Sequence, residues 1–268
     1  MRHSGAQQMR RAAQQSAGCP TFGFGMEKRG RQIYLGTSGW SYDHWREAFY
    51  PENLPTERML AYYAQHFHTA EINNSFYQLP AKNTLKHWFE ATPEDFLFTV
   101  KASRYITHMK KLKEPQKSVG AFLRRIRSLG DKLGPVLFQL PPRWHFNKER
   151  LAAFLAALSR EFRYAFEFRD HSWLNQDTYD LLARYDAAFC IYELDGFVSP
   201  RPITSDLVYV RLHGPEGPYQ GSYDARSLSG WASALASWAA QGCDVYCYFD
   251  NDERGYAAQN AMRLQAML

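Results

Sequence analysis

The sequence predicts a single (β/α)8 barrel, the TIM-barrel fold, and three observations lead to this prediction. Eight short runs of β-branched and aromatic residues follow one another along the chain. Amphipathic helical patterns separate most of these runs, as they do in parallel α/β folds. The repeat occupies roughly 235 residues, a length typical of this barrel. A doubly wound open sheet is the alternative, but we find no glycine-rich dinucleotide-binding turn.

The strands and helices are expected to alternate along the chain. The predicted strands are residues 33–38, 69–73, 96–101, 135–140, 164–169, 187–193, 207–213 and 245–250. The predicted helices are residues 56–66, 82–91, 115–130, 147–160, 176–185, 227–241 and 255–267. Thr56 resembles a helix cap, and Pro115 suits the first turn of its helix. The sixth connection, residues 194–206, is short and rich in Pro and Gly, so we expect it to be irregular.

The first 30 residues are predicted to form a flexible, disordered basic tail, because they are rich in Gln, Ala, Gly and Arg without periodicity. The barrel domain is then residues 31–268. Met26 is an alternative to Met1 as the start of translation. Residues 1–32 hold six Lys or Arg against Glu27 alone, so they carry the whole net charge of +5. The balanced remainder gives no overall attraction for polyanions.

Sequence features also bear on the cellular compartment. No apolar run approaches the roughly 20 residues of a transmembrane helix. Residues 1–25 lack the apolar core of a secretory signal. The four cysteines, Cys19, Cys190, Cys243 and Cys247, match neither a disulfide framework nor a zinc-binding spacing. These patterns predict a cytoplasmic protein without membrane contact, and they leave its oligomeric state open.

Strand alternation predicts a polar cluster inside the barrel, near the carboxyl ends of seven strands. In barrels of this kind the active site lies at that end. A neutral buried network without chemistry is the alternative, since three carboxylates balance three cations. Desolvation costs several kcal/mol per ion, which favours a ligand site over a purely structural network. The inward set is Ser38, Glu71, Asn73, Lys101, Gln139, Glu167, Arg169, Arg211, His213 and Asp250.

Acid/base chemistry is predicted from the carboxylates and the histidine of this set. Paired carboxylates act as acid and base when their environments separate their pKa values. Alternatively, Glu71 pairs with Lys101, and Glu167 with Arg169 or Arg211, so that both stay ionised. His213 can donate a proton or ligate a metal. The predicted catalytic residues are Glu71, Glu167, His213 and Asp250.

The cations and aromatics of the predicted mouth suit an anionic small molecule. Guanidinium and ammonium groups bind phosphate or carboxylate. At the end of the third strand, the segment KASRYITHMKKLK contains four lysines, one arginine and one histidine and no acidic residue, although such runs are often only solvated surface. Aromatic residues beyond the strand ends either stack on a ligand or cap the core. The predicted substrate-binding residues are Ser38, Trp40, Asn73, Lys101, His108, Gln139, Arg169, Trp173, Arg211 and Asn251.

No cofactor is predicted for this site. The clustered histidines of a multi-zinc phosphodiesterase barrel are missing from the predicted strand ends. Glu71, Glu167, His213 and Asp250 are the set that would hold a divalent metal if one bound.

Seven segments in order resemble the YecE-like family, also called domain of unknown function 72, from about Tyr34 to the C-terminus. They are GTSGWSYDHWREAFYP, AEINNSFYQLP, FTVKASRYITH, VLFQLPP, FEFRDHSW, YVRLHG and YFDNDERGYAAQNA. The resemblance implies a TIM barrel and no established activity. Asp250 replaces an Asn that is usual in the last motif, which adds a carboxylate to the mouth. Asn74 and Ser75 stand where the family tends to have Ser and Thr.

The sequence as a whole predicts an enzyme of the hydrolase, lyase or isomerase class. It would act by acid/base chemistry on a phosphate- or carboxylate-bearing substrate at the carboxyl-terminal mouth of the barrel. A nucleic-acid-binding, endonuclease-like or phosphodiesterase-like barrel is the first alternative, supported by the basic loop and the aromatics. A non-catalytic protein that binds a small molecule is the second.

Overall fold

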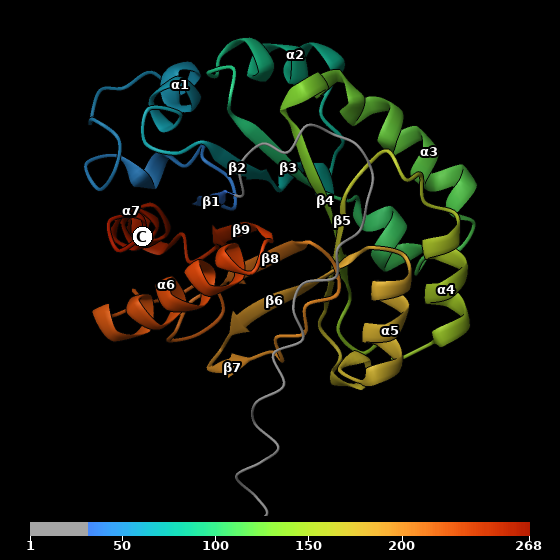
Figure 1. Cartoon of the computed structure of the whole chain (residues 1–268). Helices are drawn as coiled ribbons and strands as arrows, with labels where there is room; N and C mark the ends of the chain where they lie inside the picture. Colours follow the sequence, from blue (N-terminus) through green and yellow to red (C-terminus); the bar gives the residue numbers. More distant parts are fainter. Residues whose placement is uncertain (1–31) are drawn as a thin grey trace, which may run out of the picture.

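The computed structural model describes residues 32–268, where eight parallel strands form a nearly closed barrel with helices outside it (Figure 1). The predicted tail, residues 1–30, and Cys19 lie outside the described residues. The hydrogen-bonded order of strands is β1-β9-β8-β6-β5-β4-β3-β2, which confirms the predicted fold. The parallel strands are β1 (Ile33–Thr37), β2 (Thr69–Ile72), β3 (Leu97–Lys101), β4 (Leu133–Leu140), β5 (Tyr164–Phe168), β6 (Ala188–Leu194), β8 (Leu207–Leu212) and β9 (Asp244–Phe249).

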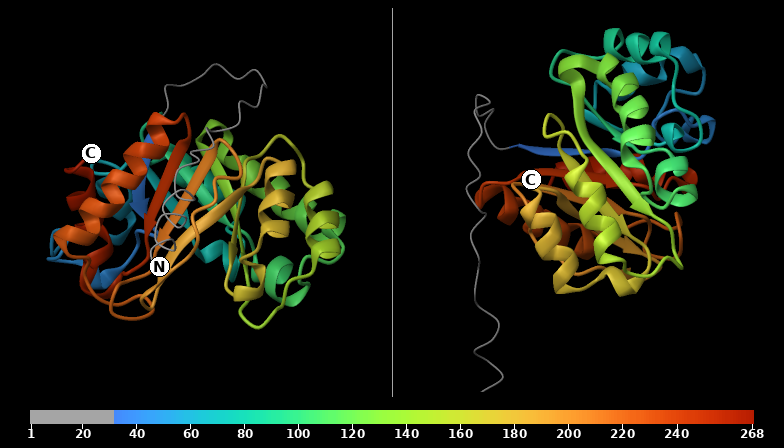
Figure 2. Two further views of the ribbon diagram at one scale, coloured as in Figure 1. Left: turned by 60° about the horizontal axis from the view of Figure 1, so that its bottom comes forward. Right: turned by 90° about the vertical axis from the view of Figure 1, so that its right-hand side faces the viewer.

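The helices lie on the outer side of the strands, as the two further views show (Figure 2). They are α1 (Met59–Tyr63), α2 (Lys82–Glu90), α3 (Pro115–Ile126), α4 (Lys148–Ala156), α5 (Gln176–Arg184), α6 (Ala225–Ala240) and α7 (Tyr256–Gln265). Side chains of Asn147, Asn175 and Asp224 accept hydrogen bonds from backbone N–H groups in the first turns of α4, α5 and α6. These caps satisfy donors that a helix leaves unpaired at its start.

Several predicted boundaries differ from the structure for local reasons. Thr56 is not a cap, because it lies within a 3-10 turn (Thr56–Arg58) that precedes α1. The helix predicted for residues 115–130 ends at Ile126 and continues as a 3-10 segment, within which Gly130 has a φ of 50°. The sixth connection is irregular, as predicted: β7 (Phe197–Val198) folds back antiparallel on β6.

The seam between β1 and β2 closes the barrel through a tyrosine. Ser38 and Glu71 form a single parallel bridge there. The Tyr63 hydroxyl, from α1, accepts from the Thr37 backbone N–H at 2.8 Å and donates to the Thr69 carbonyl at 3.0 Å. Gly36 is needed at this seam, because a Cβ atom would lie 2.3 Å from the Thr69 carbonyl oxygen. The close approach of the two strands therefore requires glycine.

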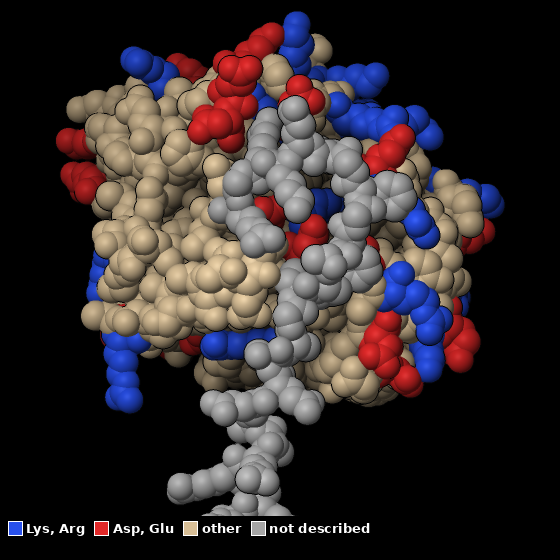
Figure 3. Space-filling view, viewed as in Figure 1, with Lys and Arg blue, Asp and Glu red and all other residues tan. Residues whose placement is uncertain are grey.

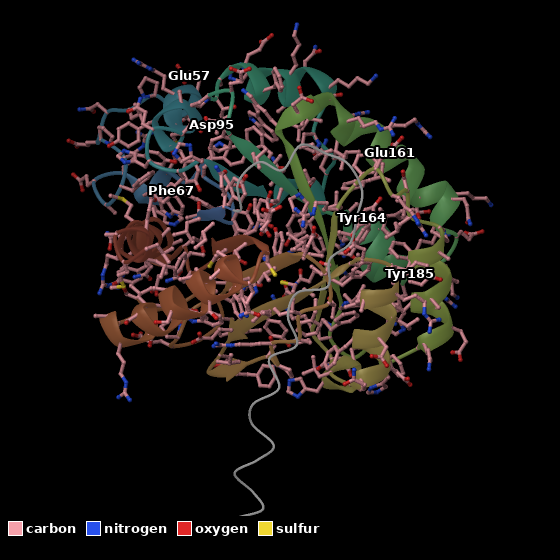
Figure 4. The ribbon with its side chains drawn as sticks, in the orientation of Figure 1. Glu57, Phe67, Asp95, Glu161, Tyr164 and Tyr185 are labelled. Atoms are coloured by element: carbon pink, nitrogen blue, oxygen red, sulfur yellow. The ribbon has the colours of Figure 1, made fainter. Side chains whose placement is uncertain are left out.

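The interior of the barrel is filled with side chains (Figure 4). Successive side chains of a strand point alternately to the interior and to the helices. The apolar side chains on the interior side form one cluster. In it Tyr34 and Tyr246 stack with ring centroids 4.5 Å apart. The cluster is Tyr34, Leu97, Leu137, Ala165, Ala188, Cys190, Leu207, Tyr209, Tyr246 and Tyr248. The polar side chains that alternation predicted lie nearer the carboxyl ends of the same strands.

Within residues 32–268, no helix is both long and apolar enough to cross a bilayer. Charged side chains of both signs are interspersed around the face seen in Figure 3. Cys190, Cys243 and Cys247 are all buried and form no disulfide within residues 32–268.

Replacing Gly36 with Ala should lower the free energy of unfolding by about 2–3 kcal/mol, since overpacking at a rigid backbone contact costs this much. Urea unfolding monitored by circular dichroism measures the change. Gly230→Ala is the matched control: nothing lies within 4 Å of a Cβ there, and the site is within helix α6. This control should be neutral or stabilising, by up to about 1 kcal/mol. Equal behaviour of the two variants would contradict the proposed role of the seam.

Candidate active site

A buried arginine ties the interior of the barrel together at its carboxyl-terminal end. Arg211, on β8, is fully buried. Its guanidinium contacts three carboxylates from other parts of the barrel: Glu71 at 2.7 Å, Glu167 at 2.8 Å and Asp250 at 3.0 Å. Burial alone would lower the pKa of Arg211, but the three carboxylates outweigh it and raise that pKa. Arg211 is therefore a permanent charge that cross-links β2, β5 and the end of β9.

Glu71 is fully engaged as a hydrogen-bond acceptor. Oε1 accepts from the Ser38 hydroxyl at 2.6 Å and from two nitrogens of Arg211. Oε2 accepts from the Tyr209 hydroxyl at 2.6 Å. The predicted alternative, a pair with Lys101, does not form, because Arg211 takes that place. With donors on both oxygens, Glu71 orients Arg211 and does not offer an atom to a substrate.

Glu167 is likewise locked as a carboxylate. It accepts hydrogen bonds from Arg169 Nε, from Arg211 Nη1 and from the Gln139 amide at 3.3 Å. Burial opposes its ionisation, but Arg169 and Arg211 outweigh burial and hold the pKa of Glu167 well below its ordinary value. The pairing alternative for Glu167 is thus the observed one. In this arrangement Glu167 holds the two arginines, and its role as acid or base stays a prediction.

His213 and Asp250 form a polarised pair. His213 Nδ1 lies 2.9 Å from Asp250 Oδ2, and Nε2 lies 2.9 Å from Arg169 Nη2. Nε2 also lies 3.4 Å from Arg211 Nη1 and 3.5 Å from Glu167 Oε1. Because Asp250 accepts at Nδ1, and because both guanidinium donors lie nearer to Nε2 than the Glu167 carboxylate, we assign the ring proton to Nδ1 and the lone pair to Nε2. Burial raises the pKa of Asp250, but Arg211 and His213 lower it further, to below its ordinary value. His213 is therefore oriented as an acceptor at Nε2.

Two donor groups of the mouth, Lys101 Nζ and Arg169 Nη1, have no hydrogen-bond partner within residues 32–268. The Lys101 ammonium makes no hydrogen bond or ion pair with residues 32–268 and lies 4.6 Å from the centroid of the Phe76 ring. Burial and the charge of Arg211 lower the pKa of Lys101 to about 8. Arg169 uses Nε and Nη2, and its Nη1 has no partner in the same part of the chain. Both groups are available to an anion.

The rim of the mouth combines an imidazole with aromatic rings. His108 follows β3 in a short π-helix (Tyr105–Met109), and its ring lies 4.9 Å from that of Phe76. Burial and Lys101 lower the pKa of His108 to about 4, so it is neutral at pH 7. Asn73 follows β2, and its Oδ1 is buried without a hydrogen-bond partner among the described residues.

Three predicted substrate-binding residues pack the protein instead of facing the cluster. Trp40 is buried with its ring 5.0 Å from Trp88. Trp173 is fully buried, 5.0 Å from Phe168. The Asn251 amide donates to the Gly221 carbonyl and to the Asn260 side chain, which fixes a loop. All three follow the end of a strand, where alternation no longer indicates the direction of a side chain.

Sequence reasoning missed two tyrosines of the site. Tyr209, which donates to Glu71, lies two residues before Arg211 on β8, so alternation could have found it. Tyr219 has its ring 5.6 Å from that of His213 and is 43% exposed. Its backbone is left-handed, with a φ of 67°. It lies in a loop rich in Gly and Pro, where only the isolated aromatic residue gave a signal.

The geometry does not favour the predicted metal alternative. Within residues 32–268, His, Cys, Asp and Glu side chains form no group of three or more that could hold a metal ion. Glu71, Glu167 and Asp250 converge on the Arg211 guanidinium, which occupies the position that a cation would need. The residues present therefore do not fit the divalent metal set.

Comparisons with known proteins agree with the fold. A family model described as "Protein of unknown function DUF72" matches residues 34–268. The UPF0759 protein YunF of Bacillus subtilis is 30% identical over 88% of this chain and 94% of its own. The UPF0759 protein YecE of Escherichia coli K12 is 33% identical over 51% of this chain and 48% of its own. The crystal structure of a DUF72 family protein from Thermotoga maritima has a TM-score of 0.79 and 29% identity, and covers 88% of this chain and 98% of that one.

Arg211→Met should lower the free energy of unfolding by about 3–5 kcal/mol at pH 7, because it leaves three carboxylates buried without their common partner. The difference from the wild type should shrink as the pH falls below about 4. The depressed pKa values of Glu167 and Asp250 stabilise the wild type above the unfolded-state pKa of about 4, and this contribution is lost as the pH falls from there toward the lower folded-state values. Urea titrations at pH 7 and at about pH 3 measure both effects. Arg160→Met, at an exposed arginine, is the control. If Arg211→Met lowers the free energy of unfolding at pH 7 by less than about 1 kcal/mol, the result would contradict the role of Arg211.

Proposed function

We propose, from the premise that the chain belongs to the DUF72 family, that its barrel mouth is an acid/base active site for a small substrate bearing a phosphate or carboxylate group. The observation that carries the proposal is a pair of donors at the barrel mouth, Lys101 Nζ and Arg169 Nη1, which have no hydrogen-bond partner within residues 32–268. Arg169 also lies next to His213, with its Nη2 2.9 Å from His213 Nε2. Largely buried cationic donors without a protein partner are favourable only where something else compensates them. An anionic ligand does so.

Arg169 is the residue proposed to bind the anion. Glu167 holds its Nε, which fixes the plane of the guanidinium. Nη1 then presents its N–H groups to an oxygen of phosphate or carboxylate, and Lys101 adds a second charge. Arg211 cannot serve in this way, because three carboxylates already surround it. Of the three cations in the mouth, only Arg169 and Lys101 are therefore proposed to bind the substrate.

His213 is the proposed base, with Asp250 as its positioning residue. Nε2 accepts a hydrogen bond from Arg169 in the unliganded arrangement. An anion that draws the Arg169 Nη2 donor toward itself frees the Nε2 lone pair. Asp250 at Nδ1 then stabilises the imidazolium that forms when Nε2 takes a proton. Anion binding and activation of the base are therefore coupled through Arg169, a property expected of an enzyme and unnecessary in a simple binding protein.

The anion site is tested by calorimetric titration with sulfate, whose charge is constant between pH 6 and 10. Arg169→Met should weaken sulfate binding by roughly 30-fold, about 2 kcal/mol, the worth of a charged hydrogen bond. It should also destabilise the fold, because Glu167 loses one partner. The double variant Glu167→Gln with Arg169→Met should recover most of that stability and still bind sulfate weakly. Recovered stability with unimpaired sulfate binding would contradict the site, and Arg160→Met serves as the control.

Sulfate affinity should fall as the pH rises through about 8, because Lys101 loses its charge there. The charges of Arg211, Asp250, Glu167 and Glu71 also act on Lys101. The pKa of Arg211 is raised and those of Glu167 and Asp250 are lowered, so these three groups stay charged over this range. We expect about a tenfold loss between pH 7 and 9.5 in the wild type, equivalent to about 1.4 kcal/mol. Lys101→Met should show weaker binding with little pH dependence. A wild-type affinity that stays constant across pH 8 would remove Lys101 from the site.

A further inference from the structure

We infer that Lys101 forms an imine with the carbonyl group of an anionic aldehyde or ketone bound at the barrel mouth. This inference rests on the proposed anion site and names the class of substrate and the covalent step. It gives Lys101 a role distinct from that of Arg169, which binds the anionic group.

Lys101 differs from the other Lys, Arg, Asp and Glu residues of the cluster because it has no ion pair within residues 32–268. Glu71, Glu167 and Asp250 are ion-paired with Arg211. Arg169 is paired with Glu167. Lys101 is largely buried at the end of β3, without an ion pair to any of residues 32–268, and its nitrogen faces the Phe76 ring. An amine in this position is neither committed to a carboxylate nor freely hydrated.

The surroundings of Lys101 make its amine nucleophilic. Only the unprotonated amine attacks a carbonyl carbon. Burial and the neighbouring Arg211 disfavour the ammonium form and lower the pKa of Lys101 to about 8. About one Lys101 in ten is then unprotonated at pH 7, against fewer than about one in a thousand for an ordinary lysine. Proximity to a second cation and an apolar wall are the usual means of activating such a lysine.

The residue that follows the neighbouring strand supplies an acceptor for the intermediate. Ile72, the last residue of β2, pairs with Val100 of β3, and Asn73 and Lys101 are the residues that follow these two. Asn73 Oδ1 is buried and has no hydrogen-bond partner among the described residues. A hydroxyl group formed on the substrate carbon beside Lys101 can donate to it. A single ligand can therefore provide both a hydroxyl donor for Asn73 Oδ1 and a carbonyl carbon for the Lys101 amine.

The step balances without a cofactor. The Lys101 nitrogen attacks the carbonyl carbon, and the proton that the nitrogen releases passes to the carbonyl oxygen, giving a carbinolamine. That hydroxyl takes a further proton and leaves as water while the nitrogen lone pair forms the C=N bond. The protonated imine withdraws electrons from the adjacent carbon, so that its C–H proton becomes acidic. His213 Nε2 is the group placed to take that proton, which links the imine to lyase or isomerase chemistry.

The test compares two lysines within one sample of the wild-type protein. Glyoxylate, a small aldehyde with a carboxylate, is added with cyanoborohydride at pH 7.5, and labelled peptides are quantified by mass spectrometry over time. Lys82, an exposed lysine on α2, is the internal reference. We expect Lys101 to be labelled at least tenfold faster than Lys82, and the advantage to fall in Arg169→Met. Labelling of Lys101 at the rate of Lys82 or slower would overturn the inference.

Further arms separate the inference from the proposed function. Acetaldehyde, which lacks the carboxylate, should label Lys101 with a smaller advantage, and an equal advantage would overturn the anionic class of substrate. Sulfate should compete with glyoxylate at Lys101. If sulfate binds the wild type but Lys101 is not labelled preferentially, the imine fails and the anion site stands. If sulfate does not bind, the proposed function itself fails.

Discussion

The contact of one buried guanidinium with three carboxylates determines what the rest of the barrel mouth can do. Arg211 joins side chains from β2, β5 and the end of β9, so the strands must hold a common register for the ions to meet. Removing these charges from water costs several kcal/mol per ion, and only their mutual contacts offset this. Glu71 and Glu167, the two glutamates that a sequence pattern would assign to acid/base chemistry, are consequently both ion-paired with Arg211. The groups proposed to act on a substrate, Lys101, Arg169 and His213, are not among the carboxylates that Arg211 holds.

Polarity inside the barrel rises toward the mouth. The stacked Tyr34 and Tyr246 rings belong to an apolar cluster. Hydroxyl pairs join other strands of the interior, as between Tyr248 and Thr69 at 2.7 Å and between Tyr209 and Thr99 at 3.0 Å. The same Tyr209 hydroxyl also contacts Glu71, so tyrosine links the neutral and the charged parts of the interior. A tyrosine can pack its ring against apolar neighbours while its hydroxyl reaches a carboxylate, which is why this residue type suits the boundary.

The sequence was sufficient for the fold and for the list of inward side chains, but not for their partners. Alternation with a period of two depends only on local backbone geometry, so it correctly put Glu71, Glu167 and Arg211 inside. The pairing of Glu71 with Arg211 joins residues 140 apart and depends on barrel closure, which no local pattern reports. Whether the Trp40 and Trp173 side chains face a ligand or the core was ambiguous for a different reason: both residues lie beyond strand ends. There, packing against Trp88 or Phe168 decides the direction of the ring.

Asp250 shows how one residue changes the balance of this site. In the segment YFDND, Asp250 stands at the position where the family resemblance implies an Asn. With Asp, the carboxylates Glu71, Glu167 and Asp250 equal the number of cations contributed by Lys101, Arg169 and Arg211. With Asn, the mouth would carry one more positive than negative charge, and His213 would lose the anion at its Nδ1. An anion would then be attracted more strongly, while an imidazolium would be stabilised less. The carboxylate at position 250 therefore opposes the proposed binding of an anion, while it provides the acceptor at Nδ1 that orients His213 for its proposed role.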